Sequence, residues 1–256
     1  MAITYRTIST VATVTGSTNT PVSMTLNAPT GATTDDLLVA CISFRGATTP
    51  SIPSTWNIIN RTQVTGNTNT NNQSIGSGLM AWTKVSGTVD YVFGAVAGQQ
   101  FPNLAFGYVV RIDGQDLTDP VAGTSVNTLS SAGNGDITTQ YVVPSFTTVT
   151  QRDYIDIMLC MGGQEVTWSN QTLGFPPGTL TTGSNYAMQE IADTNSQSGA
   201  DGSISVAYFD KKNIDVSENQ GFYATTSAIN ARHSLMVASF GGPRPSATGY
   251  SFSSFF

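Results

Sequence analysis

Residues 104–112 read LAFGYVVRI, and this stretch decides the fold class. Its largest apolar side chains occupy every second position: Leu104, Phe106, Tyr108, Val110 and Ile112. A period of two places these side chains on one face of a β-strand. The same alternation recurs at residues 22–26 and 204–208. Strands of this kind, each with one apolar face, predict sheets that pack against each other.

Two further stretches, residues 37–44 and 155–161, are almost continuously apolar, which predicts central strands buried on both faces. No segment keeps apolar residues at helical spacing over three turns, and Gly, Pro or Asn interrupts nearly every candidate. Turn signals such as Asn134-Gly135 and Asp201-Gly202 separate the apolar runs. The sequence therefore predicts an all-β protein: an antiparallel, jelly-roll-like sandwich of two sheets.

Similar segments occur in the same order in the two halves of the chain. DDLLVACISFRG (35–46) has a counterpart in DYIDIMLCMGG (153–163), and each half ends in a long strand followed by a Gly-containing turn. Two explanations stay open: a duplication, or the general likeness of sandwich strands. We expect one domain over residues 1–242, with pseudo-repeats at about 1–125 and 126–242 that interleave into a single sandwich. Residues 243–256 form a separate tail.

Charged residues are scarce, at 10% of the chain against about 25% in an average globular protein. The net charge is −6, and the ten basic residues are scattered, so nucleic acid is not an expected partner. The N-terminus has neither the basic nor the apolar region of a signal peptide, and no apolar run is long enough for a membrane span. We therefore expect a protein made in the cytoplasm, without a membrane partner.

The titratable residues form no recognisable catalytic motif. His233 is the single histidine, and no G-x-S-x-G element accompanies it, so we expect a structural histidine. Asp113, Asp116 and Asp119 lie close enough in sequence to suggest calcium, but Asp-Gly and Asp-Pro are also ordinary turn pairs. Glu165 and Glu190 could supply the two carboxylates of a glycosidase, although nothing singles them out. We expect no enzyme, no metal and no cofactor.

Tryptophan and cysteine side chains offer two more candidates. Trp56 and Trp82 are expected in the core, whereas Trp168 lies in a polar stretch and is the best candidate for an exposed ring that stacks on sugars. Cys41 and Cys160 lie inside apolar runs. They are either two buried free thiols, the simpler interpretation, or one disulfide.

The tail GGPRPSATGYSFSSFF (241–256) combines a Pro/Gly spacer with four aromatic residues near the chain end. We predict that these four residues bind a partner: Tyr250, Phe252, Phe255 and Phe256. Large exposed aromatic surfaces usually mark interaction sites, and buried aromatic residues anchor interfaces. The alternative is that the tail covers an edge of its own sheet.

Four segments together resemble a family of Thr/Gly-rich β-sandwich proteins of bacteriophages and prophages: DDLLVACISFRG (35–46), IPSTWNIINRT (52–62), LMAWTKVSG (79–87) and GYVVRIDGQDLTDPV (107–121). Thr55 replaces the glycine that family members carry before the tryptophan, and Arg111-Ile112-Asp113 replaces their usual Arg-Gly-Val. The likeness is clear only over residues 35–121, and its motifs are structural.

The resemblance implies a virion component that supplies no catalytic residues. The expected function is a capsid cement or decoration protein that stabilises the assembled shell. The alternative is a tail-fibre or receptor-binding module that recognises host surface glycan. The implied partners are the major capsid protein or other virion subunits, with a homo-oligomer as the expected state. The implied location is the capsid surface, after synthesis in the host cytoplasm.

Overall fold

The structure is a computed structural model, and its described residues form antiparallel β-strands without helices. It describes residues 2–15, 22–45, 51–62, 76–96, 104–129, 140–147, 152–162, 167–175, 184–196, 202–214, 219–226 and 233–243. The strands are β1 (Thr4–Ile8), β2 (Ala12–Thr15), β3 (Val22–Thr25), β4 (Leu37–Arg45), β5 (Asn57–Thr62), β6 (Gly76–Lys84), β7 (Val92–Val96), β8 (Leu104–Asp113), β9 (Val121–Leu129), β10 (Gln140–Thr147), β11 (Arg152–Gly162), β12 (Trp168–Phe175), β13 (Ser184–Ala187), β14 (Gln189–Ser196), β15 (Gly202–Ile214), β16 (Asn219–Thr226) and β17 (His233–Gly241). The all-β prediction is confirmed. The described part of the chain has no helix that could cross a membrane.

Two main sheets lie at the centre of the molecule. One has six strands in the order β1-β8-β4-β6-β5, with β2 also paired to β8, and the other has five in the order β14-β15-β11-β17-β9. The two almost continuously apolar runs became β4 and β11, and each lies in the middle of its sheet between two antiparallel neighbours. Both runs are buried on both faces, as the sequence predicted.

The central core lies between these two sheets and is the largest apolar cluster in the described structure. It takes the odd-numbered side chains of β4 and the even-numbered side chains of β8, such as Val39 and Phe106. The facing sheet contributes side chains from β11, β15 and β17, such as Leu159, Val206 and Met236. Because strands alternate their side chains between faces, each main sheet has a second apolar face to cover.

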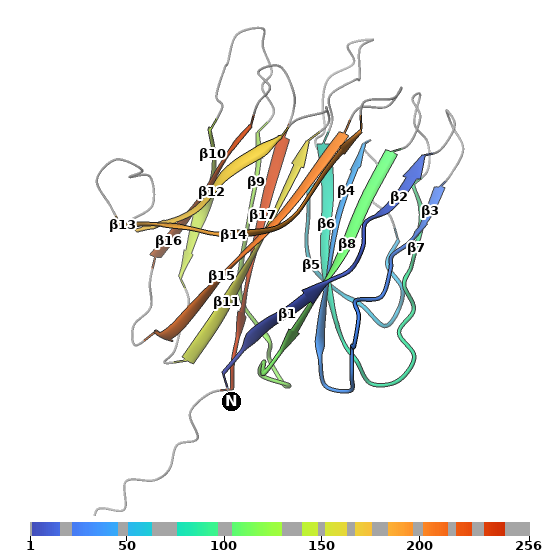
Figure 1. Cartoon of the computed structure of the whole chain (residues 1–256), viewed down its shortest axis with the longest axis horizontal. Helices are drawn as coiled ribbons and strands as arrows, with labels where there is room; N and C mark the ends of the chain where they lie inside the picture. The colour runs from blue at the N-terminus through green and yellow to red at the C-terminus, as the bar shows by residue number, and fades with distance from the viewer. Residues whose placement is uncertain are drawn as a thin grey trace, which may run out of the picture.

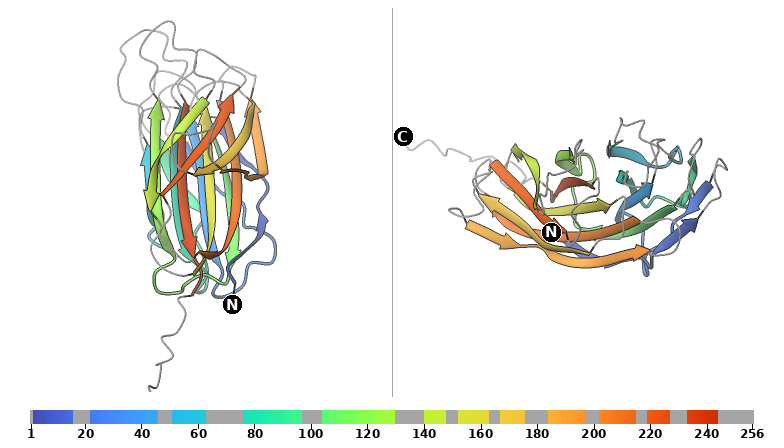
Figure 2. Two further views of the ribbon diagram at one scale, coloured as in Figure 1. Left: turned by 90° about the vertical axis from the view of Figure 1, so that its left-hand side faces the viewer. Right: turned by 90° about the horizontal axis from the view of Figure 1, so that it is seen from above.

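Two smaller sheets cover those outer faces. The β3–β7 ribbon packs Met24, Leu26 and Phe93 against the six-stranded sheet, together with Trp56. A four-stranded sheet, β10-β16-β12-β13, packs residues such as Phe222 and Trp168 against the five-stranded sheet. The molecule is therefore a row of four β-layers, seen from side to side in Figure 1 and from above in Figure 2.

The two halves of the chain do not share a sheet among the described strands. Strands β1 to β8 build the six-stranded sheet and the ribbon, and β9 to β17 build the five- and four-stranded sheets. The described strands of the two halves are therefore not exchanged between sheets: each half supplies one main sheet, and the two main sheets face each other across the central core. Each half also covers its own outer face with a small sheet, and the halves meet through the central core.

Candidate functional site

The tail predicted to bind a partner starts at the end of the molecule that we call the lower end, at the bottom of Figure 1. Tyr154 pairs with Gly241 there, so the start of β11 lies beside the last residues of β17. In the other main sheet, Thr4 pairs with Asp113 at the same end, where β1 begins and β8 ends. Pro243 is the last described residue and is exposed. Tyr250, Phe252, Phe255 and Phe256 lie outside the described residues.

Three backbone hydrogen bonds hold the root of the tail. The N–H of Gly241 donates to the carbonyl of Pro120 (2.9 Å), and the carbonyl of Gly241 accepts from the N–H of Asp116 (2.8 Å). The N–H of Gly242 donates to the carbonyl of Asp153 (2.9 Å). The segment between the two halves and the start of β11 thus fix the position from which the tail departs.

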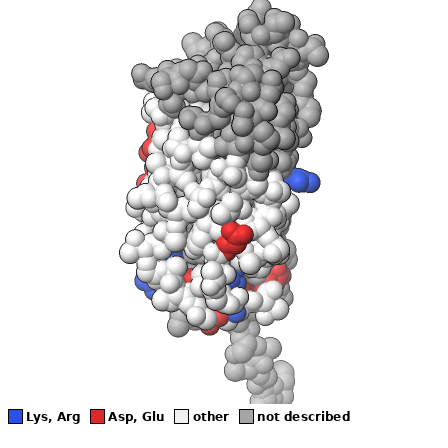
Figure 3. Space-filling model, turned by 90° about the vertical axis from the view of Figure 1, so that its right-hand side faces the viewer, with Lys and Arg blue, Asp and Glu red and all other residues white. Residues whose placement is uncertain are grey.

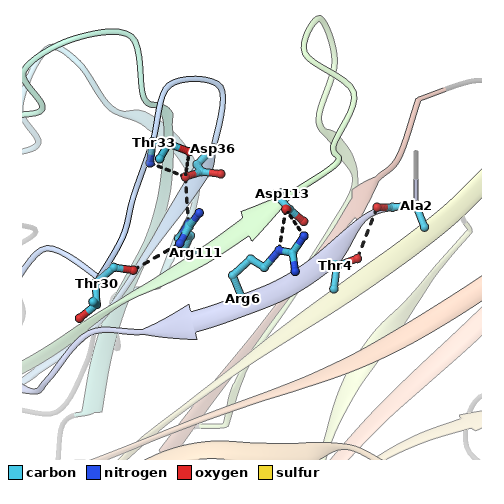
Figure 4. Close-up of polar contacts among 8 residues, drawn as sticks. All are labelled: Ala2, Thr4, Arg6, Thr30, Thr33, Asp36, Arg111 and Asp113. Atoms are coloured by element: carbon cyan, nitrogen blue, oxygen red, sulfur yellow. Dashed lines mark hydrogen bonds and ion pairs between the residues drawn. The ribbon is translucent and has the colours of Figure 1, made fainter.

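Ion pairs gather at this lower end, as Figure 4 shows for two of them. Arg6 pairs with Asp113 (2.5 Å) across β1 and β8. Arg111 Nε donates to Asp36 Oδ2 (2.9 Å), and the same oxygen accepts from the N–H and hydroxyl of Thr33. A third pair joins Lys84 Nζ to Asp35 (2.9 Å).

Most of the described surface on the β3–β7 side is uncharged. Figure 3 views this side, and neutral side chains cover most of what it shows of the described residues. The exposed residues Ser23 and Thr25 of β3 contribute to this character. A surface of this kind binds through hydrogen bonds and shape rather than through long-range electrostatic attraction.

A half-open groove lies beside Trp82, with a volume of about 290 Å³. We call it the Trp82 groove, and its lining residues are Thr55, Asn57, Trp82, Thr83, Lys84, Ser86, Thr88 and Val89. Trp82 also packs against the central core and is only partly buried, which corrects the expectation of a fully buried core residue. Asn57 lies opposite Trp82 on the neighbouring strand.

Trp56 and Trp168 are both buried. Trp56 lies in the apolar cluster between the six-stranded sheet and the β3–β7 ribbon, in a core position as predicted. Its Nε1 donates a hydrogen bond to the carbonyl of Asp90 (2.7 Å). Trp168 is only 2% exposed and donates from Nε1 to Ser203 Oγ (3.1 Å), so the proposal of an exposed, sugar-stacking Trp168 is wrong. Trp168 faces inward at the start of β12, whereas its neighbours Thr167 and Ser169 are exposed, as the alternation of a strand requires.

His233 is completely buried at the start of β17. Its ring lies edge-on to Trp168, with 5.2 Å between the ring centroids. Burial disfavours the charged imidazolium and lowers the pKa of His233 to about 4. This packing between layers is the structural role expected for His233.

The aspartates of the 113–119 segment have structural partners. Asp113 pairs with Arg6, and Asp116 Oδ1 accepts hydrogen bonds from the N–H groups of Thr118 and Asp119. This is the turn geometry that the sequence offered as the alternative to calcium. Within the described ranges, no group of three or more His, Cys, Asp or Glu side chains is placed to hold a metal ion.

The glycosidase candidate Glu190 lies on β14 beside a second carboxylate. Its Oε2 accepts a hydrogen bond from Gln171 Nε2 (2.9 Å), which also donates to Ser205 Oγ. Burial, reinforced by the charge of Glu190, raises the pKa of Asp193 to about 6. The other candidate, Glu165, lies outside the described residues.

A buried ion pair lies between the five- and four-stranded sheets. Lys211 Nζ is 2.9 Å from Asp156 Oδ2, and the two side chains are 3% and 0% exposed. Ser239 donates a hydrogen bond to the other oxygen of Asp156. Sequence reasoning missed this pair, because only the β11–β15 register brings the two residues together.

Cys41 and Cys160 are free and buried. Cys41 belongs to the central core, and Cys160 belongs to the apolar cluster between the five-stranded and four-stranded sheets. The five-stranded sheet therefore lies between the two thiols. Burial raises the pKa of both thiols. Of the two explanations left open by the sequence, free thiols are correct.

Comparisons with protein-family models, with curated proteins and with solved structures find no match for this chain.

Proposed function

We propose that this protein is a non-enzymatic structural component of a bacteriophage virion, a cement or decoration protein that binds the assembled capsid and stabilises it. Its partners are the major capsid protein or other virion subunits, and further copies of the chain. The protein is made in the host cytoplasm and acts on the capsid surface.

The hydrogen-bonded root of the tail is the observation that carries this proposal. Gly241 and Gly242 are held by Pro120, Asp116 and Asp153 at one end of the molecule. An aromatic tail that begins from a fixed point can reach a neighbouring subunit while the sandwich stays intact. Many weak contacts of this kind add up when copies occupy a repeating lattice.

The resemblance to phage β-sandwich proteins agrees with this proposal at the level of single elements. The first three segments that carry it include β4, β5 and β6 of the six-stranded sheet. The last segment runs through β8 into the lower-end turn that binds the tail root. The resembling residues thus build both the sheet and the base of the tail.

Deletion of residues 246–256 tests the proposal. The three hydrogen bonds at Gly241 and Gly242 stay in place, so the truncated protein should keep a near-native melting temperature. It should also lose binding to capsids, measured by co-sedimentation with undecorated particles. Immunogold labelling of particles carrying the full chain should place it on the head in many copies.

A matched control replaces Tyr250, Phe252, Phe255 and Phe256 with serine and keeps the tail length. Loss of binding in this variant assigns the effect to the aromatic side chains. If the truncated protein unfolds in isolation, the tail belongs to its own fold and the proposal fails. Immunogold labelling confined to the tail of the phage particle, in a few copies, would favour the second candidate.

The second candidate is a tail-fibre or receptor-binding module that recognises host glycan. The Trp82 groove favours it, because a partly exposed indole surrounded by hydroxyl and amide groups is a common lining of sugar sites. Few copies at the phage tail together with binding on a glycan array would favour this candidate, whereas many copies on the head favour the first whether or not the array is positive.

For the fold itself, we propose a jelly-roll-like sandwich that arose by duplication of one half. Each pseudo-repeat supplies one main sheet and the small sheet that covers it, and β4 and β11 hold equivalent central places. The division between the two sets of strands falls before Val121, because β9 (Val121–Leu129) belongs wholly to the second set. Superposing β1 to β8 on β9 to β17 in an experimental structure would test this origin.

A further inference from the structure

The Trp82 groove combines an aromatic surface with neutral hydrogen-bonding side chains. Asn57, Ser86 and Thr88 line it and are exposed, so their polar atoms are accessible to a ligand. The hydroxyl of Thr83 donates to the carbonyl of Thr55 (2.5 Å) and is therefore already engaged. The accessible groups come from β5 and from the turn after β6.

The groove has little net charge. Lys84 is its one ionic lining residue, and Lys84 Nζ pairs with Asp35 Oδ1 at 2.9 Å. A strongly anionic ligand would compete with this carboxylate for the ammonium group. The lining thus favours a neutral ligand with several hydroxyl groups.

The size of the groove limits the ligand to one ring. Its volume is about 290 Å³, at the lower limit of the roughly 300–1,000 Å³ typical of pockets for drug-sized molecules. Val89 is the other apolar residue of the lining. An aromatic face that meets the C–H side of a ring, with polar groups around it, matches the amphipathic surface of a sugar.

We infer that the Trp82 groove is a saccharide subsite that takes one neutral pyranose ring, stacked on Trp82 and hydrogen-bonded by Asn57, Ser86 and Thr88. The subsite is independent of the tail and of the position of the protein on a particle. A copy bound to the head of the particle and a copy bound to the tail of the particle would present this subsite equally.

Saturation-transfer NMR with free sugars tests this inference on the full chain. The probes are glucose, galactose, mannose, N-acetylglucosamine and N-acetylgalactosamine, with glucuronate as an anionic comparison. At least one neutral sugar should bind, with a dissociation constant of about 1 mM or weaker because the contact area is small. Glucuronate should bind more weakly than glucose.

Tryptophan fluorescence supplies a second readout of the same binding. Trp56 and Trp168 are buried, so a spectral change on sugar addition should come from Trp82. The change should disappear in Trp82→Phe while the other two tryptophans still emit.

Variants then identify the groove. Trp82→Ala should abolish binding, and Asn57→Ala or Thr88→Val should weaken it several-fold. Tyr186→Ala is the matched control: Tyr186 is a 46% exposed aromatic residue on β13, in a different sheet, and its removal should leave binding unchanged.

Two results would overturn the inference. One is that none of the five neutral sugars shows saturation transfer. The other is that binding survives in Asn57→Ala and Thr88→Val, which replace exposed side chains and decide the question even if Trp82→Ala does not fold.

Discussion

The ring of His233 gives a pH dependence to the stability of the fold. Its pKa is about 4 in the folded protein and about 6.5 when solvated, so between these values the unfolded chain binds more protons. Stability should therefore fall as the pH is lowered from 7 to 4. The loss from this residue should be about 2–3 kcal/mol at pH 4.5.

Urea denaturation of the wild type and of His233→Asn at pH 7.5 and pH 4.5 measures this loss as a difference of differences. The comparison is needed because Asp193, with its pKa raised to about 6, acts in the opposite direction. Its protonation favours the fold as the pH falls from 6 to 4. An equal acid sensitivity of the two proteins would contradict the assignment to His233.

The tryptophans provide a second prediction at the residue scale. Trp168 is buried between two layers and hydrogen-bonded to Ser203, so Trp168→Ala should cost about 3–5 kcal/mol. Trp82 is partly exposed beside a groove, so Trp82→Ala should cost clearly less. Urea denaturation checks the order, and a larger loss of stability in Trp82→Ala than in Trp168→Ala would contradict the partial exposure of the Trp82 indole.

The two tryptophans also show where sequence reasoning about single residues stops. Trp168 is flanked by polar residues, yet alternation along β12 turns its ring inward. Trp82 lies in an apolar segment, yet its strand has only the edge strand β5 beyond it. Local composition does not report the distance of a strand from the edge of its sheet.

At the scale of single elements, the turn after β8 depends on Gly114. Its φ is +72°, a left-handed conformation that costs other residues roughly 1–2 kcal/mol. A Cβ here would also collide with the backbone carbonyl of Ala2. Gly114→Ala should therefore lower the melting temperature markedly.

Gly87→Ala is the matched control for this change. Gly87 also has a positive φ (+125°), but no atom lies within 4 Å of its would-be Cβ. Gly87→Ala introduces backbone strain alone. A larger fall in melting temperature for Gly114→Ala would therefore measure the collision with the N-terminal segment. Equal losses would show that this segment moves aside freely.

The strands were predictable to different degrees. β4 and β11 were predicted as doubly buried because their apolar runs are continuous, and β8 was predicted from its alternation. The number of layers was not predictable. A doubly buried strand must be covered on each face, but its own sequence does not show which segment of the chain provides the cover. The cover of β4 proved to include the short β3–β7 ribbon of its own half.

At the scale of the whole molecule, the central core makes the halves interdependent. Residues 1–120 alone would expose the face of the six-stranded sheet that carries Val39, Cys41 and Phe106. Apolar surface of this extent favours association in water. We expect this fragment to aggregate or dimerise and to bind a hydrophobic dye, measured by size-exclusion chromatography and dye fluorescence.

Residues 121–243, prepared as a second fragment, serve as the complementary test. Mixing the fragments during refolding should suppress dye binding, since each supplies the cover that the other lacks. A monomeric, dye-free fragment of residues 1–120 would contradict the interdependence and define the halves as separate domains.

The position of β17 has a mechanical consequence. It lies between β11 and β9, antiparallel to both, and its last residues lead into the tail. Hydrogen bonds in such ladders run perpendicular to the strands. A pull on the tail along the strand axis therefore loads the bonds of β17 in shear, all together, whereas a pull across the strand would open them one at a time. Tension along this axis meets the most resistant direction of the sheet.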